Sequence, residues 1–430
     1  MPRDKNVKLE RRRDNQQWIL DYLVKTTGRV VSFGQDARQL PPEVRSYEMI
    51  PRVLEKHARH IETIARAAQQ AGHGMTAAEL YWNACDIYRE AQHAIYEDGN
   101  PEKIYLHGKM LECFAGLMPF ADHPIELVEI PFEGNSIQGV YHRVPGAAKA
   151  AAVLHLPGMD QTKESRLDPL HHPFVMRGLH CLHIDGPGQG TSNIRRIWLT
   201  EDNYPRAAQA ALDWLCKRSE VDTQKLTVSG YSFGSHWAMA LAAMDPRVKA
   251  IATAAATYGP KTPLFDVASP RSKQIGMYMT NIHDEDEFDA FAARLVVDPH
   301  IPGVRCPALF CAGEYDDIAP LRDVMDIYDR VRGPKELWIV ENGFHNPTNL
   351  PNFGNTPFFG MLADWLNDAL AGRKPAGLDR QVVVPVRGGA GPYTEPVKGI
   401  RLPERAGQDF SGLTEAQRGP AGMRPGDPVP

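Results

Sequence analysis

Between residues 50 and 95, apolar positions recur at the spacing of α-helices. Those from Ile50 to Ala68 are three or four residues apart, which places them on one helical face, and Gly72 ends the helix. Thr76 and Glu79 have the spacing of a capping box, and an apolar stripe of the same period follows them. Two successive amphipathic helices are therefore predicted here.

Two further helices complete a helical N-terminal segment. Asn100 is placed to cap a helix with Pro101 in its first turn, and apolar residues continue at helical spacing to Phe114. An earlier helix is predicted over Asn15–Lys25. Because no strand signal lies among them, residues 1–122 are predicted to form a separate all-helical layer. This layer is either a stabilising appendage or a lid over a pocket.

From Ile125 onward, short apolar runs alternate with helical periods. Ile125–Phe132 and Ile137–Val144 flank Glu133-Gly134-Asn135, which is a hairpin signal. Alternating strands and helices predict a mainly parallel sheet with helices on both faces. The other predicted strands are Ala151–Leu156, His180–Ile184, one starting at Leu226, Val248–Ala256, Pro307–Ala312 and Glu336–Val340, and the helices are Tyr204–Arg218, Ser235–Met244, Leu321–Val331 and Phe358–Leu370.

This α/β domain is predicted to span residues 123–372, with one long insertion. Residues 258–304 lie between two predicted strands, so they are a candidate lid. Their acidic run, residues 284–287, does not match a calcium loop and predicts a solvated helix start. Residues 373–430 are rich in Pro, Gly and charge without a helical period, which predicts an extended or disordered tail.

The composition of the 430 residues narrows the class of protein. A formal net charge of −5 provides no basic surplus for binding nucleic acid. None of the six cysteines forms a C-x-x-C pair, which indicates reduced cysteines in a cytoplasmic protein. The N-terminus lacks the apolar core of a signal peptide, and no apolar run approaches the roughly 18 residues of a membrane span. No membrane contact is therefore expected.

A G-x-S-x-G pentapeptide at residues 230–234 lies between a predicted strand and a predicted helix. That is the context of a nucleophile elbow, a tight turn that raises a serine out of the sheet. Glycine on both sides of Ser232 lets the turn close, and the N–H of Phe233 is placed to bind an oxyanion. The pentapeptide alone occurs by chance in long chains, so the assignment of Ser232 as nucleophile depends on its partners.

Partners for Ser232 follow in the required order, serine, acid and histidine, each after a later strand. Asp316 follows the strand Pro307–Ala312, and His345 follows the strand Glu336–Val340 on a loop with a nearby glycine. The carboxyl ends of parallel strands meet at one edge of a sheet, so these side chains are predicted to form a catalytic triad. Asp317 and Glu314 stand on the same loop as alternatives for the acid.

A second oxyanion donor is predicted in the loop after Ala151–Leu156. Gly158 permits a close approach of the backbone, which makes the N–H of Met159 the candidate. The loop Asp185–Gly190 is glycine-rich but lacks the Lys-Ser/Thr of a P-loop, so it is interpreted as structural packing at the sheet edge.

Four histidines close together in the sequence were weighed as metal ligands: His171, His172, His180 and His183. Their spacing fits neither H-E-x-x-H nor a Cys/His zinc motif, which favours surface or core histidines. We therefore expect no metal and no cofactor.

With these motifs, the chain resembles the α/β-hydrolase superfamily over about Ile125 to Gly372. Pro157–Glu164, Asp185–Gly190 and Gly230–Gly234 together resemble the branch of 2,6-dihydroxypseudooxynicotine hydrolase and the fermentation-respiration-switch-like proteins. The resemblance implies an α/β-hydrolase fold with an N-terminal helical cap segment that helps to cover the pocket and mediates homodimer contacts. It also implies the triad named above, with Met159 and Phe233 as oxyanion donors.

These observations predict a serine hydrolase that cleaves an acyl bond of a small molecule. The bond is a carboxylic ester or a C–C bond beside a ketone, and Tyr231 and Tyr258 are candidates for contact with substrate. A glutamate that relatives carry after the nucleophile helix has no clear equivalent between Ala254 and Phe265. Two alternatives are a non-catalytic interaction protein on a hydrolase scaffold and a peptidase of the prolyl-oligopeptidase type, although no β-propeller repeat is present.

Overall fold

The computed structural model describes residues 40–261, 264–265, 270–316, 318–341, 343–346 and 355–384. Within them, one sheet has the strand order β1-β2-β4-β3-β5-β6-β7-β8-β9. β1 and β2 form an antiparallel hairpin that pairs antiparallel with β4, and every other pairing is parallel. The strands are β1 Ile125–Phe132, β2 Asn135–His142, β3 Ala150–Leu156, β4 Leu179–Ile184, β5 Val221–Tyr231, β6 Val248–Ala254, β7 Ala308–Gly313, β8 Lys335–Val340 and β9 Asp379–Val384.

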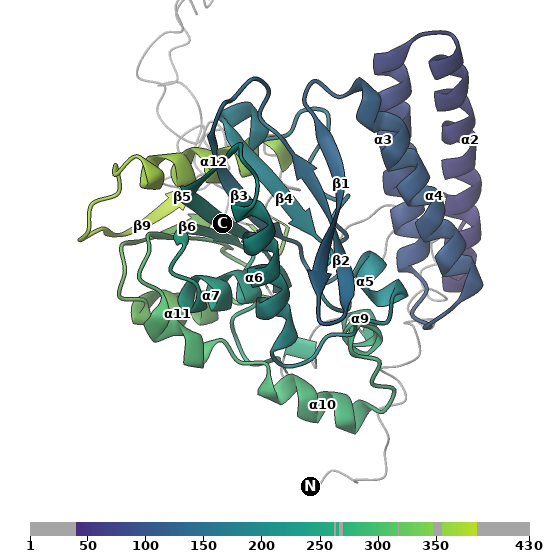
Figure 1. Ribbon diagram of the computed structural model, residues 1–430. Coiled ribbons are helices and arrows are strands. Elements are labelled where there is room, and N and C mark those ends of the chain that lie inside the picture. Colours follow the sequence, from purple (N-terminus) through teal and green to yellow (C-terminus); the bar gives the residue numbers. More distant parts are fainter. Residues whose placement is uncertain are drawn as a thin grey trace, which may run out of the picture.

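Helices cover both faces of this sheet, as predicted for the α/β-hydrolase fold (Figure 1). The interior strands β4 and β7 are buried at every position, which explains why β7 reads as an unbroken apolar run rather than an alternating one. One face packs against α6 Asn203–Cys216, α7 Phe233–Met244 and α11 Leu321–Arg330, and the other packs against α12 Asn355–Leu370. Short helices are η3 Tyr47–Met49, η4 Met118–Phe120, α5 Gly190–Ile194, η5 Val175–Arg177 and η6 Asp298–Gly303.

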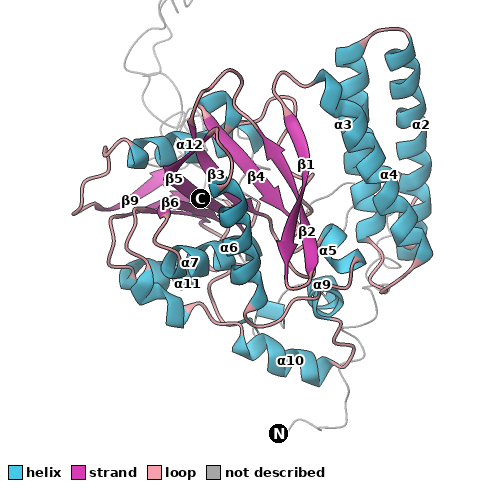
Figure 2. Ribbon diagram, in the orientation of Figure 1, coloured by secondary structure: helices cyan, strands magenta, loops and turns pink. Residues whose placement is uncertain are grey.

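The helical cap consists of three long antiparallel helices beside the β1–β2 hairpin (Figure 2). They are α2 Ile50–Gln70, α3 Gly74–His93 and α4 Pro101–Leu117. Their apolar faces share one buried core with Ile125, Val140 and Leu170 of the α/β domain, so the cap is packed onto the sheet. The predicted helix over Asn15–Lys25 lies outside the described residues, and the homodimer contact stays a prediction.

The two predicted caps of these helices have different outcomes. The side chain of Asn100 accepts a hydrogen bond of 3.0 Å from the N–H of Lys103, which confirms the predicted start of α4. The capping box of Thr76 and Glu79 is wrong, because α3 already begins at Gly74 and Thr76 lies inside its first turn. The ring of Phe120 packs against Gly74, and this tertiary contact is invisible in a local pattern.

The insertion and the tail also contain regular structure. The insertion forms α9 Pro270–Thr280 and α10 Glu285–Arg294, and the Asp284 side chain caps α10 at the N–H groups of Asp286 and Glu287, as the acidic run predicted. The segment predicted as a tail begins with β9, which adds a parallel edge strand beside β8. None of the described helices is both long and apolar enough to cross a membrane.

Candidate active site

Ser232 stands on a sharp turn between β5 and α7. Its backbone has φ 52° and ψ −121°, a strained conformation for a residue with a side chain. The turn needs glycine on both sides, since an added Cβ would lie 2.6 Å from the Ser235 Cα at Gly230 and 2.0 Å from the Leu156 oxygen at Gly234. The N–H of Ser232 donates to the Ala254 oxygen at 2.8 Å, which anchors the turn to β6.

The structure brings Ser232, His345 and Asp316 into contact. Ser232 Oγ lies 2.8 Å from His345 Nε2, and His345 Nδ1 lies 2.9 Å and 3.1 Å from the two carboxylate oxygens of Asp316. The Asp316 side chain is fully buried, whereas the His345 side chain is 17% exposed. A buried carboxylate behind a partly exposed imidazole, which in turn contacts a hydroxyl, is the arrangement that activates a nucleophile.

Main-chain contacts fix the loops that carry the acid and the histidine. Asp316 Oδ1 accepts hydrogen bonds from the N–H groups of Ile318 at 2.9 Å and Ala319 at 2.7 Å. The N–H of Tyr315 donates to the Gly343 oxygen at 2.8 Å, which ties the loop after β7 to the loop after β8. Of the two alternative acids, Glu314 donates its backbone N–H to the Val340 oxygen at 3.1 Å. Asp317 lies outside the described residues.

Tyr231 lies behind the histidine loop. Its side chain is buried, and its hydroxyl lies 3.2 Å from the His345 carbonyl oxygen and 3.0 Å from Asn346 Oδ1. Arg166 donates to the same Asn346 oxygen at 3.0 Å, and its guanidinium lies 3.8 Å above the Tyr231 ring. Burial raises the pKa of Tyr231 to about 12, so the hydroxyl keeps its proton. These contacts indicate that Tyr231 positions the loop that carries His345. The sequence analysis predicted neither this role nor the contacts of Arg166 and Asn346.

The loop after β3 runs directly beside the nucleophile. An added Cβ at Gly158 would lie 3.3 Å from the Ser232 Cβ. Side-chain amides hold this loop: the Gly158 N–H donates to Gln161 Oε1 at 3.1 Å, and Gln189 Nε2 donates to the Gly158 oxygen at 2.7 Å. Met159 follows on this loop, and its role as an oxyanion donor stays a prediction. Phe233 is the first residue of α7, where an N–H has no partner within its own helix.

The Asp185–Gly190 loop packs as predicted, and a buried ion cluster lies beneath it. Lys163 Nζ lies 2.6 Å from Glu164 Oε1 and 2.9 Å from Asp185 Oδ2, and all three side chains are fully buried. Burial opposes the charge on Asp185, but Lys163 outweighs it and lowers the pKa of the carboxyl. Burial raises the pKa of Glu164. The cluster fixes the loop after β3 to the end of β4.

The cap reaches this ion cluster through His107 of α4. His107 Nε2 lies 3.1 Å from Thr191 Oγ1, and the same hydroxyl accepts from Lys163 Nζ at 3.1 Å. Burial, with the charge of Lys163, lowers the pKa of His107 to about 3, so the ring is neutral.

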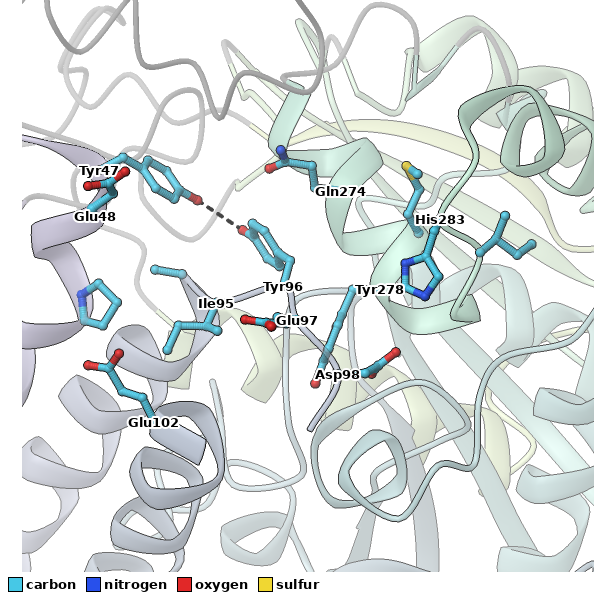
Figure 3. Close-up of a pocket in the computed structure, with 14 residues that line it drawn as sticks. Tyr47, Glu48, Ile95, Tyr96, Glu97, Asp98, Glu102, Gln274, Tyr278 and His283 are labelled. Atoms are coloured by element: carbon cyan, nitrogen blue, oxygen red, sulfur yellow. Dashed lines mark hydrogen bonds between the residues drawn. The ribbon is translucent and has the colours of Figure 1, made fainter. Parts of the chain in front are cut away.

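A pocket of about 510 Å³ lies between the cap and α9 (Figure 3). Tyr47 and Tyr96 face Gln274 and Tyr278 across it. A smaller adjoining space shares Tyr96 and Tyr278 and reaches the loop after β3 at Met159. Carboxylates at the pocket are those of Glu48, Glu97, Asp98 and Glu102.

Tyr258 does not line either of these spaces. Its ring is buried against Phe310, and its hydroxyl donates to Thr253 Oγ1 at 2.9 Å. The hydroxyls of Tyr231 and Tyr258 both have hydrogen-bond partners within the protein. Contact of these two residues with substrate stays a prediction.

Known proteins resemble this chain over most of its length. The 2,6-dihydropseudooxynicotine hydrolase of Paenarthrobacter nicotinovorans is 28% identical over 326 residues, which cover 74% of this chain and 84% of that protein. A crystal structure of 2,6-dihydroxy-pseudo-oxynicotine hydrolase matches the fold with a TM-score of 0.69 at 24% identity, covering 85% of this chain and 98% of that one.

Other hydrolases match a shorter part of the chain. The alpha/beta hydrolase xenA of Xenoacremonium sinensis is 27% identical over 208 residues, which are 45% of this chain and 48% of that protein. The family model described as Esterase FrsA-like matches residues 60–282, about half of this chain, including the second half of α2, all of α3 and α4, and the nucleophile elbow. Most of the cap and the elbow therefore fall inside one family match, and the chain belongs to the FrsA-like esterase family of α/β hydrolases.

Proposed function

We propose that the protein is a serine hydrolase in which Ser232 is the nucleophile, His345 the general base and Asp316 the residue that orients it. The observation that carries this proposal is the continuous contact from Ser232 Oγ to His345 Nε2 at 2.8 Å and from His345 Nδ1 to Asp316 at 2.9 Å. Nδ1 must hold its proton to donate to the carboxylate, which leaves the Nε2 lone pair for the serine proton.

The reaction follows from this tautomer. His345 Nε2 takes the Ser232 proton as Oγ bonds to the substrate carbonyl carbon, and the carbonyl oxygen becomes an oxyanion. The N–H groups of Phe233 and Met159 stabilise that charge. Collapse of the intermediate expels the leaving group, which takes the proton from Nε2, and an acyl-enzyme remains. Water, deprotonated by the same nitrogen, releases the carboxylic acid and restores the serine.

The substrate proposed is a small aromatic or polyketide-like molecule with an ester bond or a C–C bond beside a ketone. Two features support it. Relatives are named as esterases and as 2,6-dihydropseudooxynicotine hydrolase, and three tyrosines, Tyr47, Tyr96 and Tyr278, line the pocket between the cap and α9, which adjoins the smaller space at Met159. The triad serves both bonds, because a departing alkoxide and a departing enolate each need a proton from His345.

A fluorophosphonate probe tests the nucleophile. We expect wild-type protein and a Ser235→Ala control to be labelled, and Ser232→Ala to remain unlabelled; Ser235 is a buried serine on the same turn whose hydroxyl bonds to Ala254. Acid release from p-nitrophenyl acetate and from an aryl β-diketone then separates ester from C–C cleavage. Equal labelling of Ser232→Ala contradicts the proposal, and an unlabelled wild type would favour the non-catalytic scaffold.

A further inference from the structure

Three buried histidines from separate elements meet on the sheet. His142 ends β2, His183 lies in β4, and His172 lies in the loop between β3 and η5. Each of the three residues is at most 2% exposed. Each offers one ring nitrogen, and the three nitrogens lie within 4.8 Å of one another. The triad does not use any of these side chains.

The spacing of these rings is close to that of metal ligands. His172 Nε2 lies 3.1 Å from His183 Nε2, and the ring centroids of His142 and His172 are 4.2 Å apart. A tetrahedral zinc ion with Zn–N bonds of roughly 2.0–2.1 Å places neighbouring nitrogens about 3.3–3.4 Å apart. Small ring movements therefore suffice to bring three nitrogens around one ion.

Further contacts orient two of the rings in the way that metal-binding histidines are oriented. His142 Nδ1 lies 2.8 Å from His123 Nε2, and His123 Nδ1 lies 2.6 Å from the Asp122 carboxylate. His183 hydrogen-bonds to the main chain of Lys163. Outer partners of this kind fix the ring and its tautomer and raise the basicity of the ligand nitrogen.

We propose that His142, His172 and His183 form a zinc site with three protein ligands, with His123 beside it. Three imidazole ligands suit zinc, whereas Cu²⁺ and Ni²⁺ favour tetragonal sites. The ion would fasten the loop after β3, which also carries Met159, to β2 and β4. The expectation of no metal came from the short spacings within the sequence, and this site combines residues up to 41 positions apart from His142 to His183.

Metal analysis of the full chain tests the site. Wild-type protein produced in zinc-supplemented medium and dialysed against metal-free buffer is measured by mass spectrometry, beside His172→Gln, His183→Gln and the control His171→Gln. His171 is exposed and adjacent in sequence, so it reports surface binding. We expect one zinc per chain in wild type and in the control His171→Gln, and a loss of at least tenfold in both cluster variants. Zinc should raise the Tm of wild type and of His171→Gln but not of His172→Gln or His183→Gln.

A second measurement covers the case in which the cluster variants do not fold. Wild-type protein refolded with Co²⁺ should show the visible bands of tetrahedral cobalt, and X-ray absorption of the zinc protein should show three imidazole ligands. The proposal is overturned if wild type retains no metal, if the cluster variants retain as much as His171→Gln, or if the absorption spectrum shows fewer than three imidazoles. The rings would then be a neutral hydrogen-bonded packing cluster.

Discussion

Asp316→Asn tests whether the carboxylate sets the tautomer of His345. Asp316 Oδ1 accepts from the N–H groups of Ile318 and Ala319, and Oδ2 lies 2.9 Å from His345 Nδ1. In the variant, the amide oxygen must take the Oδ1 place, because an NH₂ group there would face two N–H donors. The NH₂ group then takes the place nearer to Nδ1, 2.9 Å away against 3.1 Å for the amide oxygen, and donates to Nδ1, so the ring proton moves to Nε2.

An imidazole that is protonated at Nε2 cannot accept the proton of Ser232. We therefore expect kcat to fall roughly 10⁴-fold, which is about 5.4 kcal/mol of transition-state stabilisation, with little change in KM. Rotation of the new amide by 180° would not restore the wild-type tautomer at low cost. It would place the NH₂ group against the two main-chain N–H donors and lose two hydrogen bonds of about 1 kcal/mol each.

Steady-state hydrolysis of a p-nitrophenyl ester measures this effect, with thermal melting to verify the fold. Glu314→Gln and Asp317→Asn are matched controls, since both remove a carboxyl from the same loop and both should stay within about threefold of wild type. The reasoning is refuted if Asp316→Asn loses less than tenfold, or if either control loses as much as Asp316→Asn does.

Three further predictions concern the surroundings of the triad. Gly234→Ala should abolish activity and lower the Tm, because the new Cβ would lie 2.0 Å from the Leu156 oxygen; an active protein with an unchanged Tm would contradict this. Tyr231→Phe should lower kcat about fivefold by releasing the His345 loop, and an unchanged kcat/KM would exclude the positioning role. His107 is neutral when folded, with a pKa of about 3, whereas the unfolded chain binds a proton near pH 6.5, so acid favours unfolding. Between pH 6 and pH 5, urea titration should therefore show wild type losing about 1 kcal/mol more unfolding free energy than His107→Gln, and equal losses would contradict it.

The elbow and the order of the triad residues were predictable because they depend on local pattern. A buried strand, two glycines and a helix specify the turn at Ser232, and parallel strands bring the loops of Asp316 and His345 to the same edge. The choice among Glu314, Asp316 and Asp317 was not predictable, since it depends on which of three neighbouring carboxyls the loop turns inward.

Other parts of the site depend on contacts between distant residues. Gln189 holds the loop after β3 at Gly158, 31 positions away, and Arg166 reaches Tyr231 from 65 positions away. Neither residue has a sequence signal apart from its place in a glycine-rich or polar loop. The edge strand β9 was predicted as tail because its side chains are mostly exposed, and a strand without a buried face leaves no apolar alternation.

The contact of His107 with Thr191 and the shared core around Ile125 and Val140 bear on how the enzyme opens. A cap that opens and closes must move away from the α/β domain without exposing buried charges. Movement of α4 would instead bring water to the buried pair of Lys163 and Asp185. The cap is thus a fixed part of the structure, and we expect that the neighbouring insertion with α9 is the element that moves when substrate enters. Exchanging caps between relatives to alter selectivity would then require exchange of the loop after β3 as well.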